Sequence, residues 1–432
     1  MPRIPNSLLR KAHTLDVFLP PLLAPCRDLH AAQNELRWLR EHVKKVAKSR
    51  RARGDTLAKG SLLRRLVKER ASGKPLQYIL GTEYFGELEI RCRPGVLIPR
   101  QDTAASVTHL VQLLRDATKL PTELRLLDLC TGTGCIPLLF QHELHVARDD
   151  VVVRALGVDV SNGALHLARR NVQRLYKNSG SLAKGRVQLI KADVLVDPFA
   201  DQLAGHMPLK AALDYKRLPS FWDILISNPP YISPSEYWKT TTRSVRGYEP
   251  KLALVPPPHA NQDDIQQGDM FYPRLLKIAR DVQAKIVLLE IADMPQALRV
   301  AQRALELGIF DGIEIWREDP SAHPSAVTEQ NDFRVRGDGN ARSVICWRGL
   351  GTVWLGKLDT VVGQDDARRL FQGHGGGLLP KNPRSESPFP LAPQFNTVPR
   401  ARNGPERHKE SVASKASQQK VVHKPTKSKV AK

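Results

Sequence analysis

The chain has 432 residues, 41% of them hydrophobic, so it can form two ordinary domains and bury at least one sizeable core. Its apolar runs have the length of strands and stay well short of the roughly 20 residues of a membrane-spanning helix. The five cysteines are scattered and include no CxxC pair, which argues against a disulfide framework and against a zinc site. We therefore expect neither a membrane span nor a bound metal.

The formal net charge of +22 favours polyanionic partners such as RNA or a ribosome. Basic residues are most concentrated in residues 40–53 and after about residue 369. Such runs are as often a solvated surface as a nucleic-acid site. The basic ends therefore predict at most a non-specific contact with RNA.

The N-terminal segment carries Arg3, Arg10 and Lys11 and no acidic residue before Asp16, which is compatible with a mitochondrial transit peptide. Prolines at positions 2, 5, 20 and 21 are expected to interrupt any helix there. From residue 29 to 71 apolar residues recur at helical spacing, so we assign residues 1–75 to an N-terminal segment and a small helical domain.

Short apolar runs at residues 78–81, 84–86, 88–90 and 96–98 are separated by glycine and proline. This pattern predicts a hairpin, and we assign residues 76–104 to a hairpin linker.

Strand-like apolar runs then alternate with helical segments over residues 105–358, which we assign to one α/β domain. The predicted strands cover residues 124–129, 155–158, 187–189, 224–226 and 286–290. Alternation of this kind indicates a mostly parallel sheet with helices on both faces. Residues 201–220 and 256–267 interrupt the rhythm and are predicted to be surface insertions, and residues 371–432 to be a disordered basic tail.

The first of these strands runs into a turn that contains glycine and then into a helix-like segment. Such a turn lets a ligand approach the backbone closely, at the edge where open α/β sheets bind ligands. Glycines at a strand-to-helix junction can also serve only to reverse the chain. The candidate cofactor-binding residues here are Asp128, Cys130, Thr131, Gly132, Thr133 and Gly134.

Two further acids follow neighbouring predicted strands. Asp159 ends the second strand, where a carboxylate can accept hydrogen bonds from ribose hydroxyls. Asp193 follows the third strand, and either a contact with adenine or a turn or helix-capping role fits it. The pattern GxGxxG is absent and no lysine follows the glycines, which disfavours NAD and ATP as ligands.

The most specific motif is Asn228-Pro229-Pro230-Tyr231, directly after the strand at residues 224–226. Two prolines cannot continue a central strand, so carbonyl groups are left without ladder partners. The side-chain oxygen of Asn228 and the carbonyl of Pro229 can then accept both hydrogens of one planar NH2 group, while Tyr231 packs against its face. This grip would orient the nitrogen lone pair for methyl transfer and stabilise the developing positive charge.

Together these motifs resemble the release-factor glutamine methyltransferase family. Further segments that resemble the family lie at residues 75–81, 96–100, 248–250, 252–254, 268–272 and 288–290. The resemblance implies a Rossmann-like class I S-adenosylmethionine-dependent methyltransferase domain, preceded by a small helical domain and a hairpin linker. It also implies S-adenosyl-L-methionine as cofactor and, as partner and substrate, the GGQ loop of a class I peptide chain release factor.

Carried over to this chain, the resemblance places residues 130–134, Asp159 and Val194 at the cofactor. It places Asn228, Pro229, Pro230 and Tyr231 at the substrate amide, with Asn228 also near the cofactor. The helical N-terminal domain makes the chain resemble the organellar branch of the family, which favours mitochondria over the cytoplasm. We also expect a monomer.

The chain departs from the family at three places. Cys130 stands where bacterial members have glycine, and residues 101–104 read Gln-Asp-Thr-Ala in place of Pro-Glu-Thr-Glu. The two predicted insertions are longer than in the compact bacterial pattern. These departures leave the role of the acids near residue 102 and the substrate contacts open.

Two other functions are compatible with the sequence. The same amide clamp would serve a methyltransferase that acts on the exocyclic amine of adenine in DNA or RNA. Base flipping calls for aromatic residues that stack on the base, and the N-terminal domain is charged and poor in them. A non-catalytic protein that binds RNA or the ribosome fits the charge alone.

Overall fold

The structure is a computed structural model that describes residues 3–178, 185–196, 207–259, 262–322 and 327–357. All of these belong to one unit, Met1–Gly375. The predicted tail at residues 371–432 lies outside the described residues. Within the described part of the chain, no helix combines the length and the apolar character needed to cross a membrane.

The N-terminal part consists of helices: α1 (Asn6–Leu15), α2 (Leu19–Cys26), α3 (Leu29–Arg51) and α4 (Lys59–Ala71). Their apolar faces share one core, in which Leu22 and Leu39 are fully buried. The expectation that prolines 20 and 21 interrupt any helix was wrong. They lie in the first turn of α2, where a backbone N–H has no partner within the helix to lose.

The linker contains a short helix and a hairpin: α5 (Leu76–Leu80), β1 (Thr82–Phe85) and β2 (Leu88–Arg91). The predicted hairpin is confirmed for residues 82–91, where Phe85 pairs with Leu88. The prediction was wrong for residues 78–80, which are helical because Leu76 and Ile79, three positions apart, both pack into the helical core. Residues 96–98 form no strand.

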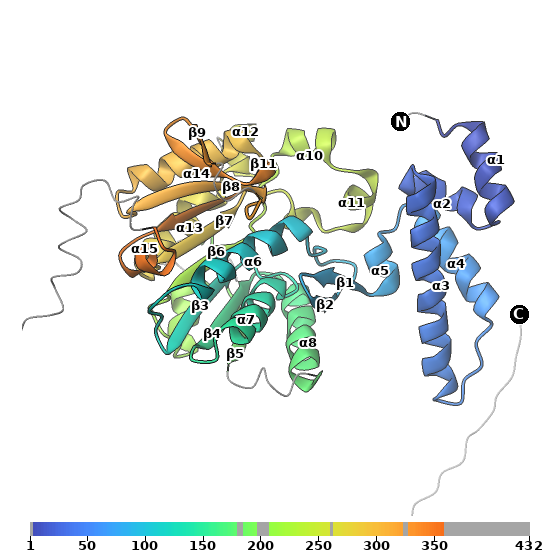
Figure 1. Cartoon of the computed structure of the whole chain (residues 1–432), viewed down its shortest axis with the longest axis horizontal. Coiled ribbons are helices and arrows are strands. Elements are labelled where there is room, and N and C mark those ends of the chain that lie inside the picture. Colours follow the sequence, from blue (N-terminus) through green and yellow to red (C-terminus); the bar gives the residue numbers. More distant parts are fainter. Residues whose placement is uncertain (1–2, 179–184, 197–206, 260–261, 323–326, 358–432) are drawn as a thin grey trace, which may run out of the picture. The chain divides into compact units, whose positions relative to one another are not determined.

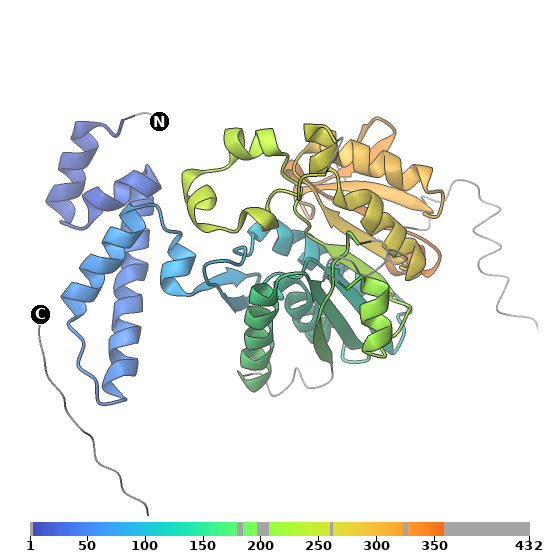
Figure 2. The same cartoon turned by 180° about the vertical axis from the view of Figure 1, so that it is seen from behind.

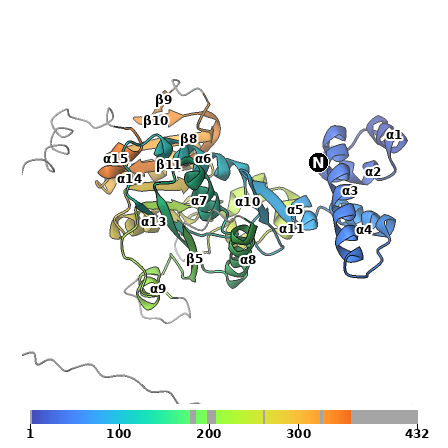
Figure 3. The same cartoon turned by 60° about the horizontal axis from the view of Figure 1, so that its bottom comes forward.

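Within the described residues, the central sheet has nine strands in the order β5-β4-β3-β6-β7-β11-β8-β10-β9. Figure 3 shows β9 and β10 on the side of the sheet away from β5. The strands are β3 (Glu123–Leu129), β4 (Val152–Asp159), β5 (Arg186–Lys191), β6 (Ile224–Ser227), β7 (Ile286–Glu290), β8 (Gly312–Asp319), β9 (Val327–Gln330), β10 (Phe333–Arg336) and β11 (Asp338–Trp347). Strands β3 to β7 are parallel, and β11 runs antiparallel between β7 and β8. The five predicted strands and the predicted α/β class are confirmed.

Helices cover both faces of this sheet, as views from opposite sides show (Figures 1 and 2). The helices of this part of the chain are α6 (Gln101–Arg115), α7 (Cys135–Ala147), α8 (Asn162–Asn178), α9 (Leu209–Tyr215), α10 (Pro234–Thr240), α11 (Arg243–Tyr248), α12 (Asp264–Gly268), α13 (Phe271–Asp281), α14 (Met294–Glu306) and α15 (Leu350–Trp354), with a 3-10 turn at Lys251–Ala253. Helices α6 and α7 lie over one face, and α13 and α14 over the other.

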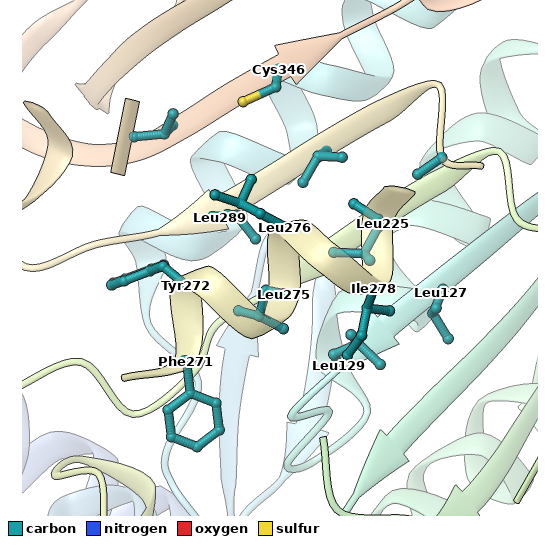
Figure 4. Close-up of a cluster of buried hydrophobic side chains, with 14 of the residues drawn as sticks. Leu127, Leu129, Leu225, Phe271, Tyr272, Leu275, Leu276, Ile278, Leu289 and Cys346 are labelled. Atoms are coloured by element: carbon teal, nitrogen blue, oxygen red, sulfur yellow. The ribbon is translucent and has the colours of Figure 1, made fainter. Parts of the chain in front are cut away.

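Alternation along the strands divides the core between these two faces. On β3, Leu124 and Leu126 pack under α6 and α7, whereas Leu127 and Leu129 pack under α13. Figure 4 shows the second layer, with Leu275, Leu276 and Ile278 of α13 over the sheet. A strand buried on both faces holds its end rigidly, and those ends carry the predicted site residues.

The prediction of surface insertions was wrong for part of residues 201–220. Helix α9 buries Leu209, Ala212 and Leu213 in the same core as α13. In the second segment, Asp263 caps α12 by a reciprocal pair of hydrogen bonds with Gln266. Residues 197–206 and 260–261, which belong to or adjoin these segments, lie outside the described residues.

Candidate active site

Strand register brings the predicted site residues to one edge of the sheet. Leu129, the last residue of β3, pairs with Val158 of β4 on one side and with Ser227 of β6 on the other. Ser227 in turn pairs with Leu289 of β7. The residues that follow or end these strands therefore lie side by side, where the strand order reverses and open α/β sheets bind ligands.

The turn after β3 has the shape of a ligand cradle. Cys130, Gly132 and Gly134 all have positive φ, of 66°, 55° and 76°. A Cβ at Gly132 would meet nothing within 4 Å, so the space above it is open, whereas a Cβ at Gly134 would lie 3.2 Å from the Cβ of Ala168. The turn thus tolerates Cys130 in a conformation that costs a residue other than glycine about 1–2 kcal/mol.

Asp159 shapes this turn as well as bordering it. Its carboxylate accepts hydrogen bonds from the backbone N–H of Gly132 (2.9 Å) and of Ser161 (2.8 Å). Each carboxylate oxygen has a second lone pair, so the group can also accept bonds from ligand hydroxyls. Burial raises the pKa of Asp159, and the backbone N–H bonds oppose this shift.

Beneath the turn lie polar groups without partners. Asp128 is completely buried, and neither of its oxygens makes a hydrogen bond of ordinary geometry with a described residue. Burial raises the pKa of this carboxyl well above its usual range. The nearby Thr131 hydroxyl, which is also buried, opposes this shift without a hydrogen bond of ordinary geometry. Asp128 therefore lies under the turn and not in its opening. The predicted contact between Asp128 and the cofactor would require a ligand group, or a movement of the turn, that reaches this buried carboxyl.

The third strand leads to a tight turn around Asp193. Its Oδ1 accepts a hydrogen bond from the backbone N–H of Leu195 (2.9 Å), a turn-forming bond that matches the alternative role weighed for this acid. Val194 is buried, and its carbonyl accepts a bond from Arg274 (3.0 Å). A cavity of about 420 Å³ borders this turn, lined by Asp193, Leu195, Pro257, Pro258, His259, Gln262, Met270, Pro273, Arg274 and Lys277.

The Asn228–Tyr231 motif begins directly after β6 and is held by side chains from other elements. The Ser227 hydroxyl donates to the carbonyl of Leu129 (2.7 Å), which ties the start of the motif to β3. Asn228 Nδ2 lies 3.2 Å from the Thr103 hydroxyl of α6, and the Tyr231 hydroxyl donates to Glu290 (3.2 Å). Asn228 is half-buried and both prolines are buried. The motif is therefore a fixed, partly open loop.

The sequence reasoning missed Glu290 as a site residue. It ends β7, is 7% exposed, and accepts hydrogen bonds from the hydroxyls of Thr103 (2.5 Å) and Tyr231 (3.2 Å). Burial raises its pKa to about 7, and the nearby Asp102 adds to the rise, whereas the two hydroxyls and Arg342 lower it. An acid that ends an otherwise apolar strand, as Asp159 does, was the signal that could have revealed it.

A second network holds the far end of the motif. The Gln296 side chain of α14 donates to the carbonyl of Tyr231 (3.2 Å) and to Asp269 (3.0 Å). Arg299 pairs with Asp269 through two bonds of 2.7 and 3.0 Å. The Tyr272 hydroxyl donates to the carbonyl of Glu290 (2.9 Å). Helices α13 and α14 thus lock the loop against β7.

The described residues contain no group of three or more His, Cys, Asp or Glu side chains arranged to hold a metal ion. The site's polar groups are instead backbone N–H groups, carboxylates, hydroxyls and one carboxamide. Such groups suit the recognition of ribose hydroxyls and of a planar amide.

Comparison with known proteins finds relatives that are named as glutamine methyltransferases. The chain is 33% identical over 257 residues to the mitochondrial MRF1 N(5)-glutamine methyltransferase MTQ1 of Saccharomyces cerevisiae, covering 59% of this chain and 68% of the relative. It is 32% identical over 301 residues to the probable MRF1 mitochondrial N(5)-glutamine methyltransferase of Schizosaccharomyces pombe, covering 69% of this chain and 87% of the relative.

A bacterial relative, the release factor glutamine methyltransferase of Chlorobaculum tepidum, is 34% identical over 206 residues, which cover 47% of this chain and 60% of the relative. No protein-family model matches the chain. Among solved structures, a putative class I S-adenosylmethionine-dependent methyltransferase from Listeria monocytogenes is 12% identical, with a TM-score of 0.32 over 80% of this chain and 88% of that one. The structural similarity is too low to add to the argument.

Proposed function

Because the chain belongs to the release factor glutamine methyltransferase family, we propose that it methylates the side-chain amide nitrogen of the glutamine in the GGQ motif of a peptide chain release factor, with S-adenosyl-L-methionine as the methyl donor. The observation that carries this proposal is the Asn228–Tyr231 loop, which is fixed beside an open glycine turn at one edge of the sheet. A planar amide and a nucleoside-containing donor would meet there.

The donor fits the residues of the turn. The open space above Gly132 and the spare lone pairs of Asp159 match the polar surface of a ribose. When bound, S-adenosylmethionine supplies a methyl group activated by its sulfonium charge. We propose that residues 130–134 and Asp159 hold it, with Asp193 and Val194 bordering the adenine end and Asp128 supporting the turn from below.

The substrate amide would be held by two acceptors. The Asn228 side-chain oxygen and the Pro229 carbonyl accept both N–H groups of the glutamine, which turns the nitrogen lone pair toward the donor side. Both acceptors also stabilise the positive charge that grows on nitrogen. The amide proton becomes acidic only after transfer, so positioning rather than an ionised base supplies most of the catalysis.

We further propose that the protein acts in mitochondria, since two of its relatives are named mitochondrial enzymes. That it acts as a monomer stays a prediction from the sequence. We keep as a proposal the division of the chain into an N-terminal segment and helical domain (1–75), a hairpin linker (76–104) and a methyltransferase domain (105–358). The basic ends would add a non-specific contact with RNA or the ribosome. Cell fractionation with a tag at the C-terminus would test the location.

Adenine methylation and a purely RNA-binding role are not favoured, because the curated relatives are named for glutamine. The decisive experiment incubates the full chain with labelled S-adenosylmethionine and a release factor. Label should enter the release factor and should be lost when its GGQ glutamine is replaced by alanine. Equal labelling of that variant, or labelling of RNA in its place, would contradict the proposal.

A further inference from the structure

The sheet places Glu290 beside the amide clamp. Ser227 pairs with Leu289, so Asn228, which follows β6, and Glu290, the last residue of β7, lie side by side at the edge of the sheet. Thr103 from α6 lies between them, with its hydroxyl 2.5 Å from Glu290 Oε2 and 3.2 Å from Asn228 Nδ2. A continuous chain of hydrogen bonds therefore joins the buried carboxyl to the clamp.

The direction of this chain follows from counting hydrogens. An ionised carboxylate only accepts hydrogen bonds, and a hydroxyl has one hydrogen to donate. The Thr103 hydrogen is therefore used on Glu290, and the Thr103 oxygen can only accept from Asn228. The Asn228 group that faces Thr103 must then be its NH2, which leaves its oxygen to face away from Thr103.

A reversed Asn228 amide would fail as a clamp. It would present NH2 to the NH2 of the substrate glutamine, so that two donors would meet where a donor and an acceptor are needed. An isolated asparagine has no strong preference between its two orientations, because oxygen and nitrogen are nearly the same size. The clamp thus needs a group that selects one orientation.

We propose that Glu290 is a positioning residue that, through the Thr103 hydroxyl, fixes the Asn228 carboxamide with its oxygen toward the methyl-accepting amide. This inference rests on the proposed function and adds to it the group that orients the clamp. Tyr231, the last residue of the motif, donates to the other oxygen of Glu290, so one buried carboxylate holds both ends of the Asn228–Tyr231 loop.

The groups around Glu290 determine the pH range in which this relay, the hydrogen-bond chain from Glu290 through Thr103 to Asn228, can work. Asp102 and Thr103 face it from α6, Tyr231 from the loop after β6, and Arg342 from β11, while the Tyr272 hydroxyl of α13 binds its carbonyl. Together with burial they bring the pKa of Glu290 to about 7. A protonated Glu290 can donate a hydrogen bond to the Thr103 hydroxyl. The Thr103 hydroxyl can then donate its own hydrogen to Asn228, so the Asn228 carboxamide is no longer held in one orientation. Turnover should therefore rise as the pH passes through about 7.

The test compares Thr103→Val, which removes the hydroxyl, with Thr103→Ser, which keeps it. Thr108→Val is the matched control, because Thr108 lies on the same helix and its hydroxyl binds Glu143 away from the site. Thr103→Val should lower kcat about tenfold or more, with little change in the dissociation constant for S-adenosylmethionine. Thr103→Ser and Thr108→Val should stay near wild type. An undiminished kcat for Thr103→Val, or an equal loss in Thr103→Ser, would overturn the proposal.

A second measurement needs no release factor. In the full chain with 15N-labelled asparagine, the side-chain NH2 signal of Asn228 is identified by its absence in Asn228→Ala. This signal should move with pH around a midpoint of about 7 in the wild type and in Thr103→Ser, and move less in Thr103→Val. The same movement in all three proteins would contradict the relay. Failure of the wild type to methylate a release factor would instead contradict the proposed function, and this signal alone would then decide the role of Glu290.

Discussion

Asp159 combines two tasks that the sequence suggested only in part. Its carboxylate accepts hydrogen bonds from the backbone of Gly132 and Ser161. Its remaining lone pairs can accept hydrogen bonds from ribose hydroxyls. A single substitution would therefore remove both the proposed ligand contact and a support of the turn.

Asp159→Ala should weaken the binding of S-adenosylmethionine about 10- to 100-fold, because bonds to a charged group are typically worth about 1.5–3 kcal/mol. Isothermal titration calorimetry measures this directly. Asp159→Asn keeps one acceptor oxygen, so its dissociation constant should lie between those of wild type and Asp159→Ala. An unchanged dissociation constant for Asp159→Ala would remove this residue from the site.

Glu290 should make the stability of the fold depend on pH. Its pKa is raised from 4.5 to about 7 in the folded chain, so the fold favours the protonated form. The resulting stabilisation is fully present below pH 4.5 and is lost as the pH rises through about 7. It amounts to at most about 3 kcal/mol.

Urea unfolding of wild type and Glu290→Gln at several pH values tests this sign. The free energy of unfolding of the wild type should fall relative to that of Glu290→Gln between pH 5 and pH 8. A difference between the two proteins that does not vary with pH would show that Glu290 titrates normally. The proposed relay needs the ionised form, so activity and stability should change in opposite directions over this range.

At the scale of elements, α1 and α2 belong to the folded helical domain. Ala12, Leu19, Leu22 and Leu23 from these helices are buried in the same core as the later helices. Ala12 lies within the first 18 residues, which the sequence suggested as a transit peptide, so part of that segment packs into the helical core.

Leu22→Ala should lower the free energy of unfolding of the helical domain by about 2–5 kcal/mol, the usual cost of removing a buried leucine side chain. Leu15→Ala is the matched control, since Leu15 is 54% exposed, and should change stability by less than about 0.5 kcal/mol. Chemical denaturation followed by circular dichroism measures both. Similar effects of the two substitutions would mean that this segment does not pack as described.

The parallel strands were predictable because β3 to β7 are mostly apolar runs, and their ends were marked by polar or proline residues. The strands β8 to β11 were not predicted, since their mixed parallel and antiparallel pairing depends on a return of the chain that the local pattern does not encode. The contact between Thr103 and Glu290 joins residues 187 positions apart and depends on how α6 packs across the sheet. Helix α9 was taken for a surface insertion because its three core residues are too few to stand out.

At the scale of the whole molecule, the candidate site and the cores that support it lie within residues up to 357. Truncation after Gly375 should therefore leave kcat and KM for a release factor within about twofold of the full chain. The removed part is rich in lysine and arginine, so its loss should weaken RNA binding at low salt and reduce the salt dependence. The methylation assay tests the expectation for kcat and KM, and filter binding tests the expectation for RNA. A large fall in kcat would show that the site extends beyond residue 375.

In the proposed mechanism Asn228 orients a glutamine amide for methyl transfer, and mass spectrometry of the methylated release factor tests this role. Wild type and Asn228→Ala are each incubated with S-adenosylmethionine and a release factor, and the GGQ peptide is analysed by mass spectrometry. Wild type should add one methyl group to the glutamine. Asn228→Ala should bind the cofactor almost normally and methylate on the order of a hundredfold more slowly, since one preorganised acceptor is worth about 2.7–4 kcal/mol. Methylation of the glutamine by Asn228→Ala at the wild-type rate would contradict the account.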